Sequence, residues 1–300
     1  MKKVLVVGAG SCLSVAICKQ LYKNYDFVGT YNKSKPNNIF FSKLLKIDFL
    51  SPKIYTPASF FDDADDILFF IGSYLPKYND NQVYKSNYST LKNFLKIYKK
   101  YNIKSRIIYI SSTSVYAGNN STVINEKSKK SPSSVYGKAK IEAESLLIKS
   151  GAPYIIIRPT TIYGKSFTKT FIELKKNLKN KKLFLYGTGN NNCSYCFEND
   201  LVKVIKKIID LPITSIDFNI VNPPITQKKF VNSLAKLFDI NKINSIPIED
   251  TLKDNNHPFS KSLIKRFSRD CIFDTTKVKK ELRIKLTNQF SRAIKETFKN

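Results

Sequence analysis

The sequence has few cysteines and no long apolar run, and both absences narrow the classes of protein that it can encode. The five cysteines are odd in number and scattered, without the density of a secreted disulfide framework, so a reducing compartment is expected. Cys193 and Cys196 have CxxC spacing, but neither a second such pair nor a histidine pair completes a zinc site, and we predict no bound metal.

Membrane and secretion signals are also missing. No stretch approaches the ~20 consecutive apolar residues that span a bilayer. Residues 1–7 run directly into Gly8, without the longer apolar region and the cleavage site of a signal peptide. We therefore predict a cytoplasmic protein with no membrane partner.

Acidic residues are scarce relative to basic ones, with 23 Asp and Glu against 51 Lys and Arg and a formal charge of +28. Such a charge raises nucleic acid as a partner, because clustered cations attract phosphates. Here the lysines are spread from Lys2 to Lys299, and Lys, Asn, Ile, Tyr and Phe are abundant together, as an AT-rich genome would produce. We expect no nucleic-acid partner, whereas anionic small substrates such as nucleotides are electrostatically favoured.

Short apolar runs alternate with segments of helical periodicity, a pattern typical of a parallel sheet with crossover helices. The expected strands are residues 4–7, 27–30, 44–47, 67–70, 106–110, 154–157 and 217–221. The expected helices are residues 15–22, 89–100 and 135–150. This plan predicts a Rossmann-type, doubly wound α/β fold.

The spacing becomes less regular after Gly164, where prolines punctuate shorter segments. Residues 217–221 read as a strand that returns to the main sheet. We therefore predict a dinucleotide-binding Rossmann domain of residues 1–164 plus about 195–224. A smaller substrate-binding lobe would comprise residues of about 165–194 plus 225–300.

The first expected strand ends in a glycine-containing loop that leads into a helix. A Rossmann fold holds a pyrophosphate at this position, against backbone N–H groups and the helix N-terminus. Two glycines alone also fit a plain tight turn. We assign cofactor binding in this loop to Gly8, Gly10, Ser11, Cys12 and Leu13.

No acidic residue follows the second expected strand, where an NAD enzyme usually places a carboxylate against the ribose hydroxyls. A carboxylate would repel a 2′-phosphate, whereas Asn32, Ser34 and Lys35 could hold one. We therefore expect NADP(H) to be preferred, with NAD(H) as the alternative. A solvated turn is the other interpretation of this segment.

The expected strand at 106–110 breaks into hydroxyl residues, and Tyr136 and Lys140 follow on a helix, where residues four apart share a face. The charge of Lys140 favours the Tyr136 phenolate by lowering a pKa that is ordinarily ~10. Such a tyrosine exchanges a proton with a carbonyl or alcohol oxygen while hydride moves at the carbon, and the Ser112 hydroxyl holds that oxygen. A surface pair in a chain rich in Tyr and Lys is the alternative.

The wider pattern resembles the extended short-chain dehydrogenase/reductase family of NAD(P)-dependent nucleotide-sugar epimerases, dehydratases and reductases, and the resemblance covers nearly the whole chain. The matching features are Asn87, Ser-Ser-x-x-Val-Tyr from Ser111, Glu126, Pro132, Tyr136, Lys140, Glu144, Arg-Pro-x-x-x-Tyr-Gly from Arg158, Tyr-Gly-x-Gly from Tyr186, Asn199-Asp200 and Asp-x-x-Lys from Asp274.

The resemblance implies further cofactor-binding positions and one departure. Gly72, Asn87, Tyr136 and Lys140 are expected at the cofactor, with Lys140 holding the nicotinamide ribose. Asp48 is expected at its adenine, although helix capping explains Asp48 equally well. Aligning the family's Gly-x-x-Gly-x-x-Gly loop on Gly8 puts Ser11 and Ser14 at the second and third glycines. We expect weaker or shifted dinucleotide binding from this departure.

The resemblance also implies a nucleotide-activated sugar as substrate and a role in carbohydrate biosynthesis. Thr113 and Ser114 stand where the family's dehydratases have Asp-Glu, which disfavours dehydration, and Cys193 stands where many members have an arginine that clamps the substrate diphosphate. We expect these three residues to contact the substrate. We predict a keto-sugar reductase, with a C4 epimerase that retains NAD as the close alternative and a non-catalytic dinucleotide-binding regulator as the third. Family habit implies a homodimer through the helices near 82–101 and 134–150.

Overall fold

The computed structural model describes residues 1–300 except 62, 73–77, 255–268, 287–289 and 299–300. Two compact units make up the chain. The first, which we call the N-terminal unit, comprises residues 1–119, 126–159 and 202–219. The second, the C-terminal unit, comprises residues 120–125, 160–201 and 220–300. This division follows from which residues contact one another. The predicted dinucleotide-binding domain and substrate-binding lobe stay predictions.

A seven-stranded parallel sheet is the centre of the N-terminal unit, with the strand order β12-β7-β5-β4-β1-β2-β3. Its strands are β1 (Lys3–Val7), β2 (Asp26–Tyr31), β3 (Lys43–Lys46), β4 (Asp66–Phe69), β5 (Arg106–Ile110), β7 (Tyr154–Pro159) and β12 (Ile216–Ile220). These are the seven strands predicted from the sequence, and the Rossmann-type fold is confirmed.

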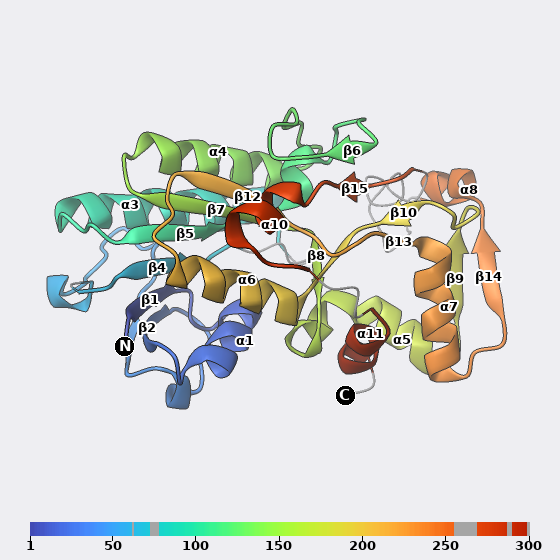
Figure 1. The fold of residues 1–300 in the computed structure, drawn as a ribbon, viewed down its shortest axis with the longest axis horizontal. Helices are drawn as coiled ribbons and strands as arrows, with labels where there is room; N and C mark the ends of the chain where they lie inside the picture. The colour runs from blue at the N-terminus through green and yellow to red at the C-terminus, as the bar shows by residue number, and fades with distance from the viewer. Residues whose placement is uncertain (62, 73–77, 255–268, 287–289, 299–300) are drawn as a thin grey trace. The chain divides into compact units, whose positions relative to one another are not determined.

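Helices cover both faces of this sheet. Figure 1 shows α3 and α4 on one face and α1 and α6 on the other. The helices and short turns of this part of the chain are α1 (Cys12–Leu21), η1 (Asn38–Phe40), η2 (Ala58–Phe60), α2 (Asp80–Tyr84), the π-helical η3 (Lys85–Ser89), α3 (Thr90–Lys100), η4 (Thr113–Tyr116), α4 (Val135–Lys149) and α6 (Glu198–Asp210). The three predicted helices correspond to α1, α3 and α4.

Alternation along the strands explains how one face of the sheet is buried. Leu5 and Val7 of β1 point to the same side, because successive side chains of a strand alternate. They pack in one buried cluster with Phe94 of α3 and with Ala143 and Leu147 of α4. Burial of these apolar side chains therefore holds α3 and α4 on the sheet.

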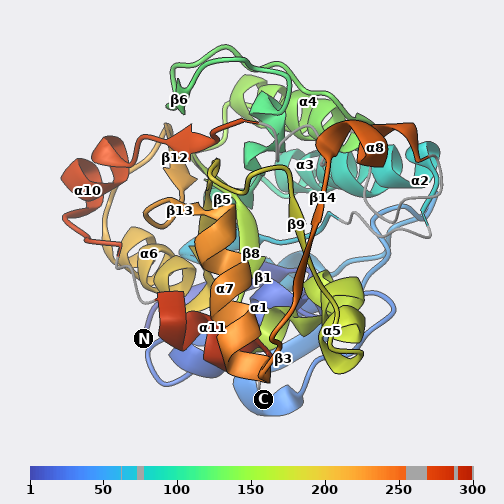
Figure 2. The same ribbon diagram turned by 90° about the vertical axis from the view of Figure 1, so that its right-hand side faces the viewer.

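The C-terminal unit is built from short strand pairs around a separate apolar core. Its elements are β6 (Val123–Ile124), β8 (Thr161–Tyr163), η5 (Lys165–Phe171), α5 (Ile172–Lys179), β9 (Leu183–Tyr186), β10 (Asn192–Cys193), β11 (Tyr195–Phe197), β13 (Ile225–Thr226), α7 (Gln227–Phe238), β14 (Ile243–Ile246), α8 (Ile248–Lys253), β15 (Ile272–Phe273), α10 (Thr276–Leu282) and α11 (Phe290–Phe298). Figure 2 shows α7 beside β9, and α7 also contacts α11. Tyr163, Phe230 and Phe290 pack together in the core of this unit.

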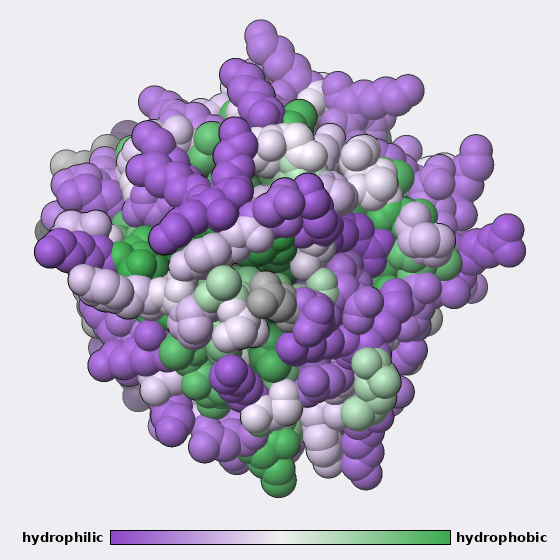
Figure 3. Space-filling view, turned by 90° about the vertical axis from the view of Figure 1, so that its left-hand side faces the viewer, coloured by the Kyte–Doolittle hydropathy of each residue, from purple (hydrophilic) through white to green (hydrophobic). Residues whose placement is uncertain are grey.

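The molecular surface is mainly hydrophilic on the face that Figure 3 displays, where apolar side chains occur in small separate groups. This agrees with a sequence whose excess charge is spread along its length. Within the described ranges, no helix is both long and apolar enough to cross a membrane.

Candidate active site

The carboxyl ends of the parallel strands gather the predicted site residues of the N-terminal unit at one edge of its sheet. β1 ends at Val7 before the glycine loop, and β5 ends at Ile110 before the hydroxyl run. Open α/β sheets bind their ligands at this edge.

Helix α4 begins at a capped N-terminus that places Tyr136 next to the hydroxyl run. The Ser134 side chain accepts a hydrogen bond from the Gly137 N–H at 3.2 Å. A Cβ on Gly137 would lie 2.8 Å from the carbonyl oxygen of Ser114, so only glycine allows this close approach. Tyr136 then forms a hydrogen bond with Ser112, as the predicted catalytic pair requires.

Lys140 lies one turn after Tyr136 and is buried, with 3% of its surface exposed. Its ammonium group donates a hydrogen bond to the carbonyl oxygen of Ile110 at 2.9 Å. The Lys140 Nζ atom lies 5.8 Å from the ring centroid of Tyr136 and 4.9 Å from that of Tyr109. Burial lowers the pKa of Lys140 to about 7, against an opposing effect of Glu144.

The pKa of Tyr136 differs from the sequence-based expectation. We expected Lys140 to lower it, but burial raises the pKa of Tyr136 to about 12, and the hydrogen bond from Ser112 opposes this only in part. The physical reason is that desolvation disfavours the phenolate. Burial also lowers the pKa of Lys140, which weakens the cation that was expected to stabilise the phenolate.

The hydroxyl run after β5 is folded into the 3₁₀ turn η4. The Ser112 side chain caps this turn by accepting the Ser114 N–H at 3.1 Å. Thr113 is buried and its hydroxyl donates to the carbonyl oxygen of Pro159 at 3.4 Å. The Ser114 hydroxyl is buried and has no hydrogen-bond partner among the described residues. The substrate-binding roles of Thr113 and Ser114 stay predictions.

The loop after β1 forms a backbone cradle. Gly8 has φ +96°, a left-handed conformation that favours glycine, and the N–H groups of Gly8 and Ala9 donate to the carbonyl oxygen of Thr30 at 3.2 and 2.7 Å. A Cβ on Gly10 would lie 2.1 Å from the carbonyl oxygen of Ser34. The segment after β2 therefore lies directly against the glycine loop.

Helix α1 starts where the cradle ends. The Ser11 hydroxyl caps it by accepting the N–H of Ser14 at 3.1 Å, and Ser14 is fully buried. Serine thus fills both positions where the family has glycine, and one of these side chains is used to start the helix. Cys12 is exposed and Leu13 is buried. The glycine cradle and the helix N-terminus fit a dinucleotide pyrophosphate.

Asn32, Ser34 and Lys35 are exposed on the segment that contacts Gly10. Gly72 and Asn87 lie beside the catalytic residues, since a Cβ on Gly72 would be 2.5 Å from Asn87 Oδ1 and 2.8 Å from Lys140 Nζ. This close approach leaves room for glycine alone.

Asn87 lies in a π-helical turn. The periodicity of the sequence did not predict this turn. The turn spans Lys85–Ser89 between α2 and α3. Asn87 is fully buried and its Nδ2 donates to the carbonyl oxygen of Val83 at 2.8 Å. Such turns often occur at functional sites.

The helix-capping alternative for Asp48 is wrong. Its Oδ1 accepts the N–H of Leu50 at 2.9 Å, and its carbonyl oxygen accepts the N–H of Ser51 at 3.1 Å. No helix begins there, so the exposed Asp48 side chain stabilises a turn. The adenine contact stays a prediction.

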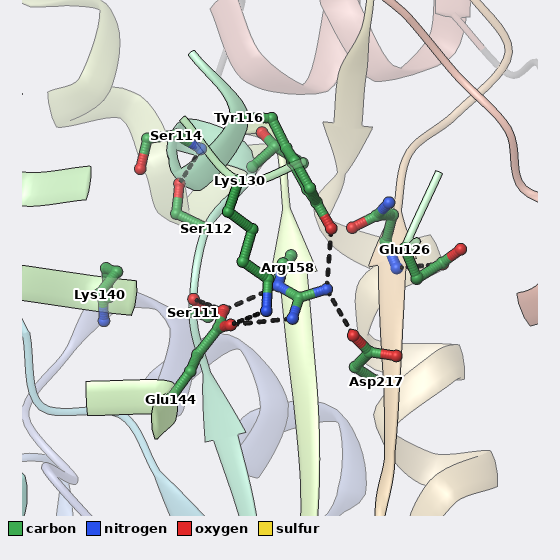
Figure 4. Close-up of polar contacts among 12 residues, drawn as sticks. Ser111, Ser112, Ser114, Tyr116, Glu126, Lys130, Lys140, Glu144, Arg158 and Asp217 are labelled. Carbon is green, nitrogen blue, oxygen red and sulfur yellow. Dashed lines mark hydrogen bonds and ion pairs between the residues drawn. The ribbon is translucent and has the colours of Figure 1, made fainter. Parts of the chain in front are cut away.

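A buried ion-pair network borders the catalytic residues, and sequence reasoning missed it (Figure 4). Glu144 of α4 accepts two hydrogen bonds from Arg158 of β7, at 2.7 and 2.8 Å. Arg158 also donates to the Tyr116 hydroxyl at 2.9 Å and to Asp217 at 2.7 Å. The matches of Glu144 and Arg158 to the family pattern were the only available signal.

Cys193 belongs to the C-terminal unit. It ends β10, and its sulfur accepts a hydrogen bond from Asn191 Nδ2 at 3.4 Å. Its predicted substrate contact stays a prediction.

Residues 4–222 match the family described as "NAD dependent epimerase/dehydratase family". The chain belongs to this family. It is an enzyme of the nicotinamide-dependent epimerase/dehydratase type, as predicted. One curated relative, the "Uncharacterized UDP-glucose epimerase YtcB" of Bacillus subtilis (strain 168), is 27% identical over 70% of this chain and 73% of its own length.

Two further proteins are similar to this chain. The "dTDP-D-glucose 4,6-dehydratase" of Dictyostelium discoideum is 32% identical over 44% of this chain, and the match spans only 33% of that protein. The solved structure of a UDP-glucuronic acid 4-epimerase from Bacillus cereus in complex with NAD superimposes with a TM-score of 0.80 at 20% identity, covering 99% of this chain and 97% of that one. At this identity the structural match supports the shared fold.

Proposed function

We propose that this enzyme interconverts the C4 epimers of a nucleotide-activated sugar. The observation that carries the proposal is the meeting of Tyr136, Lys140 and Ser112 at the end of β5, in the same unit as the glycine cradle. We favour this reaction over the keto-sugar reductase predicted from the sequence, because a relative and a solved structure similar to this chain are named as epimerases.

The chain's own residues would perform the proton transfer and hold the cofactor. A nicotinamide dinucleotide held there would supply reversible hydride transfer at the sugar carbon. The N-terminus of α1, Gly8, Gly10 and Asn87 would hold the dinucleotide. Lys140 would hold the dinucleotide together with these groups.

Tyr136 is the proton-transfer group in this proposal. It takes the proton of the sugar hydroxyl during oxidation and gives it back during reduction. The Ser112 hydroxyl orients the same oxygen through a hydrogen bond. Because the pKa of Tyr136 is about 12, the phenolate needs nearby positive charge, which Lys140 supplies in its protonated form.

A direct assay tests the proposal. The purified protein is incubated with UDP-glucose, UDP-galactose, UDP-glucuronic acid or their N-acetylated counterparts without added cofactor, and the C4 epimer is quantified by proton NMR. We expect epimer to accumulate to a constant ratio from either side. Absence of epimer from this panel, together with NADPH oxidation on a UDP-4-keto sugar, would favour the reductase.

The reductase remains the second candidate because of one observation. The segment at 31–35 carries no acid, is exposed from Asn32 on, and places Ser34 against Gly10, where an adenosine ribose would be held. This favours NADP(H), which a net reductase exchanges at each turnover. Mass spectrometry of ligands released from the purified protein would identify which dinucleotide is retained.

We also propose a homodimer through α3 and α4. Ile148 of α4 is an apolar side chain that is 46% exposed, and an interface between two copies of this helix would bury it. Multi-angle light scattering should give twice the mass of the 34.4 kDa chain.

A further inference from the structure

Helix α4 contacts the end of β5 through a stripe of three side chains spaced four residues apart. Tyr136 bonds with Ser112, and Lys140 donates to the backbone two residues earlier. Glu144, the third member, accepts a hydrogen bond from Ser111 Oγ at 2.6 Å. Residues 110–112, which we call the catalytic segment, are thus each held by one residue of this stripe. Figure 4 shows Glu144 reaching Ser111, with the hydrogen bond between them marked.

Glu144 is held more firmly than an ordinary buried carboxylate. It is 1% exposed and meets Arg158 through two parallel hydrogen bonds, the strongest geometry for such a pair. Lys130 reaches the same carboxylate at 3.0 Å from the loop before α4. Burial alone would raise the pKa of Glu144, but Arg158, Lys130 and Ser111 lower it, so the carboxylate is charged.

We propose that Glu144 is a positioning residue of the active site, which holds the catalytic segment through Ser111 and acts as the electrostatic partner of the Lys140 ammonium group. This proposal rests on the function proposed above and extends it. Arg158 and Lys130 then have a definite role. They fix the carboxylate in place and offset part of its charge.

The electrostatic part follows from the groups that face Lys140. On α4 these are Tyr136 and Glu144, and from β5 they are the Ile110 carbonyl and the ring of Tyr109. Glu144 is the group that raises the pKa of Lys140, against burial that lowers it to about 7. The ammonium form, which Tyr136 needs, is lost as the pH rises through this pKa.

Arg158 and Lys130 both pair with the Glu144 carboxylate. Removing the Glu144 charge should therefore make Lys140 lose its proton at lower pH. Removing the Lys130 charge should have the opposite effect, because the carboxylate is then less neutralised. A purely structural role for Glu144 predicts no downward shift in Glu144→Gln, so this variant discriminates between the two roles.

The experiment measures the protonation of Lys140 directly, without substrate. Protein labelled with [ε-¹³C]lysine is titrated by NMR, and the Lys140 signal is assigned by its loss in Lys140→Met. It should stand apart, because ordinary lysines titrate near ~10.4. We expect Glu144→Gln to lower the Lys140 midpoint by about one pH unit and Lys130→Met to raise it by less, since single nearby charges shift a pKa by about 1–3.

Asp66→Asn is the matched control. Asp66 is a buried carboxylate, 2% exposed, which meets Arg106 through two hydrogen bonds of 2.7 and 3.0 Å at the amino end of β4. Its loss should reduce thermal stability much as Glu144→Gln does, because each substitution leaves an arginine poorly paired beside the sheet. The Lys140 midpoint should stay unchanged in this variant.

Each outcome decides the proposal. An unchanged or raised midpoint in Glu144→Gln would overturn it. Should Glu144→Gln fail to fold, Glu144→Asp decides instead, because it keeps the charge but shortens the side chain that brings the carboxylate to the end of β5. A lowered Lys140 midpoint there supports the proposal, and no shift or an upward shift overturns it. These readings do not depend on epimerase activity, so failure of the proposed function and failure of this inference are distinguishable.

Discussion

The two ends of the candidate site are held together by different kinds of contact. At the end of β5, the contacts are made by side chains, because Lys140 and Glu144 form hydrogen bonds with the catalytic segment. At the end of β1, the contacts are made by the backbone. The Gly8 N–H donates a hydrogen bond to β2, and Gly10 lies against a carbonyl oxygen of the loop after β2. Substitutions at the first end should therefore change chemistry and pH dependence, whereas substitutions at the second should act through space-filling and cofactor affinity.

Lys140→Met should give the largest effect, because Lys140 is expected to serve both proton transfer and cofactor binding. It removes the cation beside Tyr136 and a group expected to hold the cofactor ribose. Turnover should fall by more than the ~10²–10⁴-fold typical of one acid–base group, and dinucleotide affinity should fall too. Lys138→Met, an exposed lysine of the same helix, is the control. Steady-state kinetics and fluorescence titration measure both quantities. Intact affinity would confine Lys140 to the catalytic end.

Tyr136→Phe should separate the two ends most cleanly. It deletes one hydroxyl, so turnover should fall by about 10²–10⁴-fold while dinucleotide binding stays nearly intact. Epimer formation and fluorescence titration are compared on the same preparation. Full activity in this variant on a substrate that the wild type converts would remove Tyr136 from the mechanism.

Ser112→Ala should reduce turnover less. A hydrogen bond to a charged group is worth about 1.5–3 kcal/mol, which corresponds to about 10-fold to 100-fold. The alanine leaves the proton path through Tyr136 in place but removes the orienting bond and the cap of η4. A loss as large as that of Tyr136→Phe would mean that Ser112 itself transfers the proton.

Gly10→Ala should affect the cofactor end alone. Its Cβ would lie 2.1 Å from the Ser34 carbonyl oxygen, so the segment after β2 must move. Overpacking of this kind costs about 1–3 kcal/mol, and we expect dinucleotide affinity to fall by about tenfold. Gly151→Ala is the control, since nothing lies within 4 Å of its Cβ and its φ of +77° makes alanine strain the backbone away from the cofactor end. Unchanged affinity would show that the cradle tolerates displacement of its neighbouring loop.

The sequence predicted the fold well because buried parallel strands read as short apolar runs, and all seven were found. The four-residue spacing also predicted the pairing of Tyr136 with Lys140, since helix geometry is local. The Glu144–Arg158 pair was not predicted, because its partners come from different elements and only tertiary packing brings them together. The direction of the Tyr136 pKa could not be predicted either, because it depends on burial.

The smallest expected effect concerns the choice between NADP(H) and NAD(H) at the end of β1. Asn32 and Lys35 are exposed, so any contact with a 2′-phosphate is solvent-screened and worth about 0.2–1 kcal/mol, or up to about fivefold. We expect NADPH to bind more tightly than NADH by a factor of this size. Asn32→Asp should reverse the preference, because a carboxylate holds ribose hydroxyls and repels a 2′-phosphate. Parallel fluorescence titrations of both dinucleotides measure it. Equal affinities, or an NADH preference in the wild type, would refute the NADP assignment and strengthen the epimerase with retained NAD.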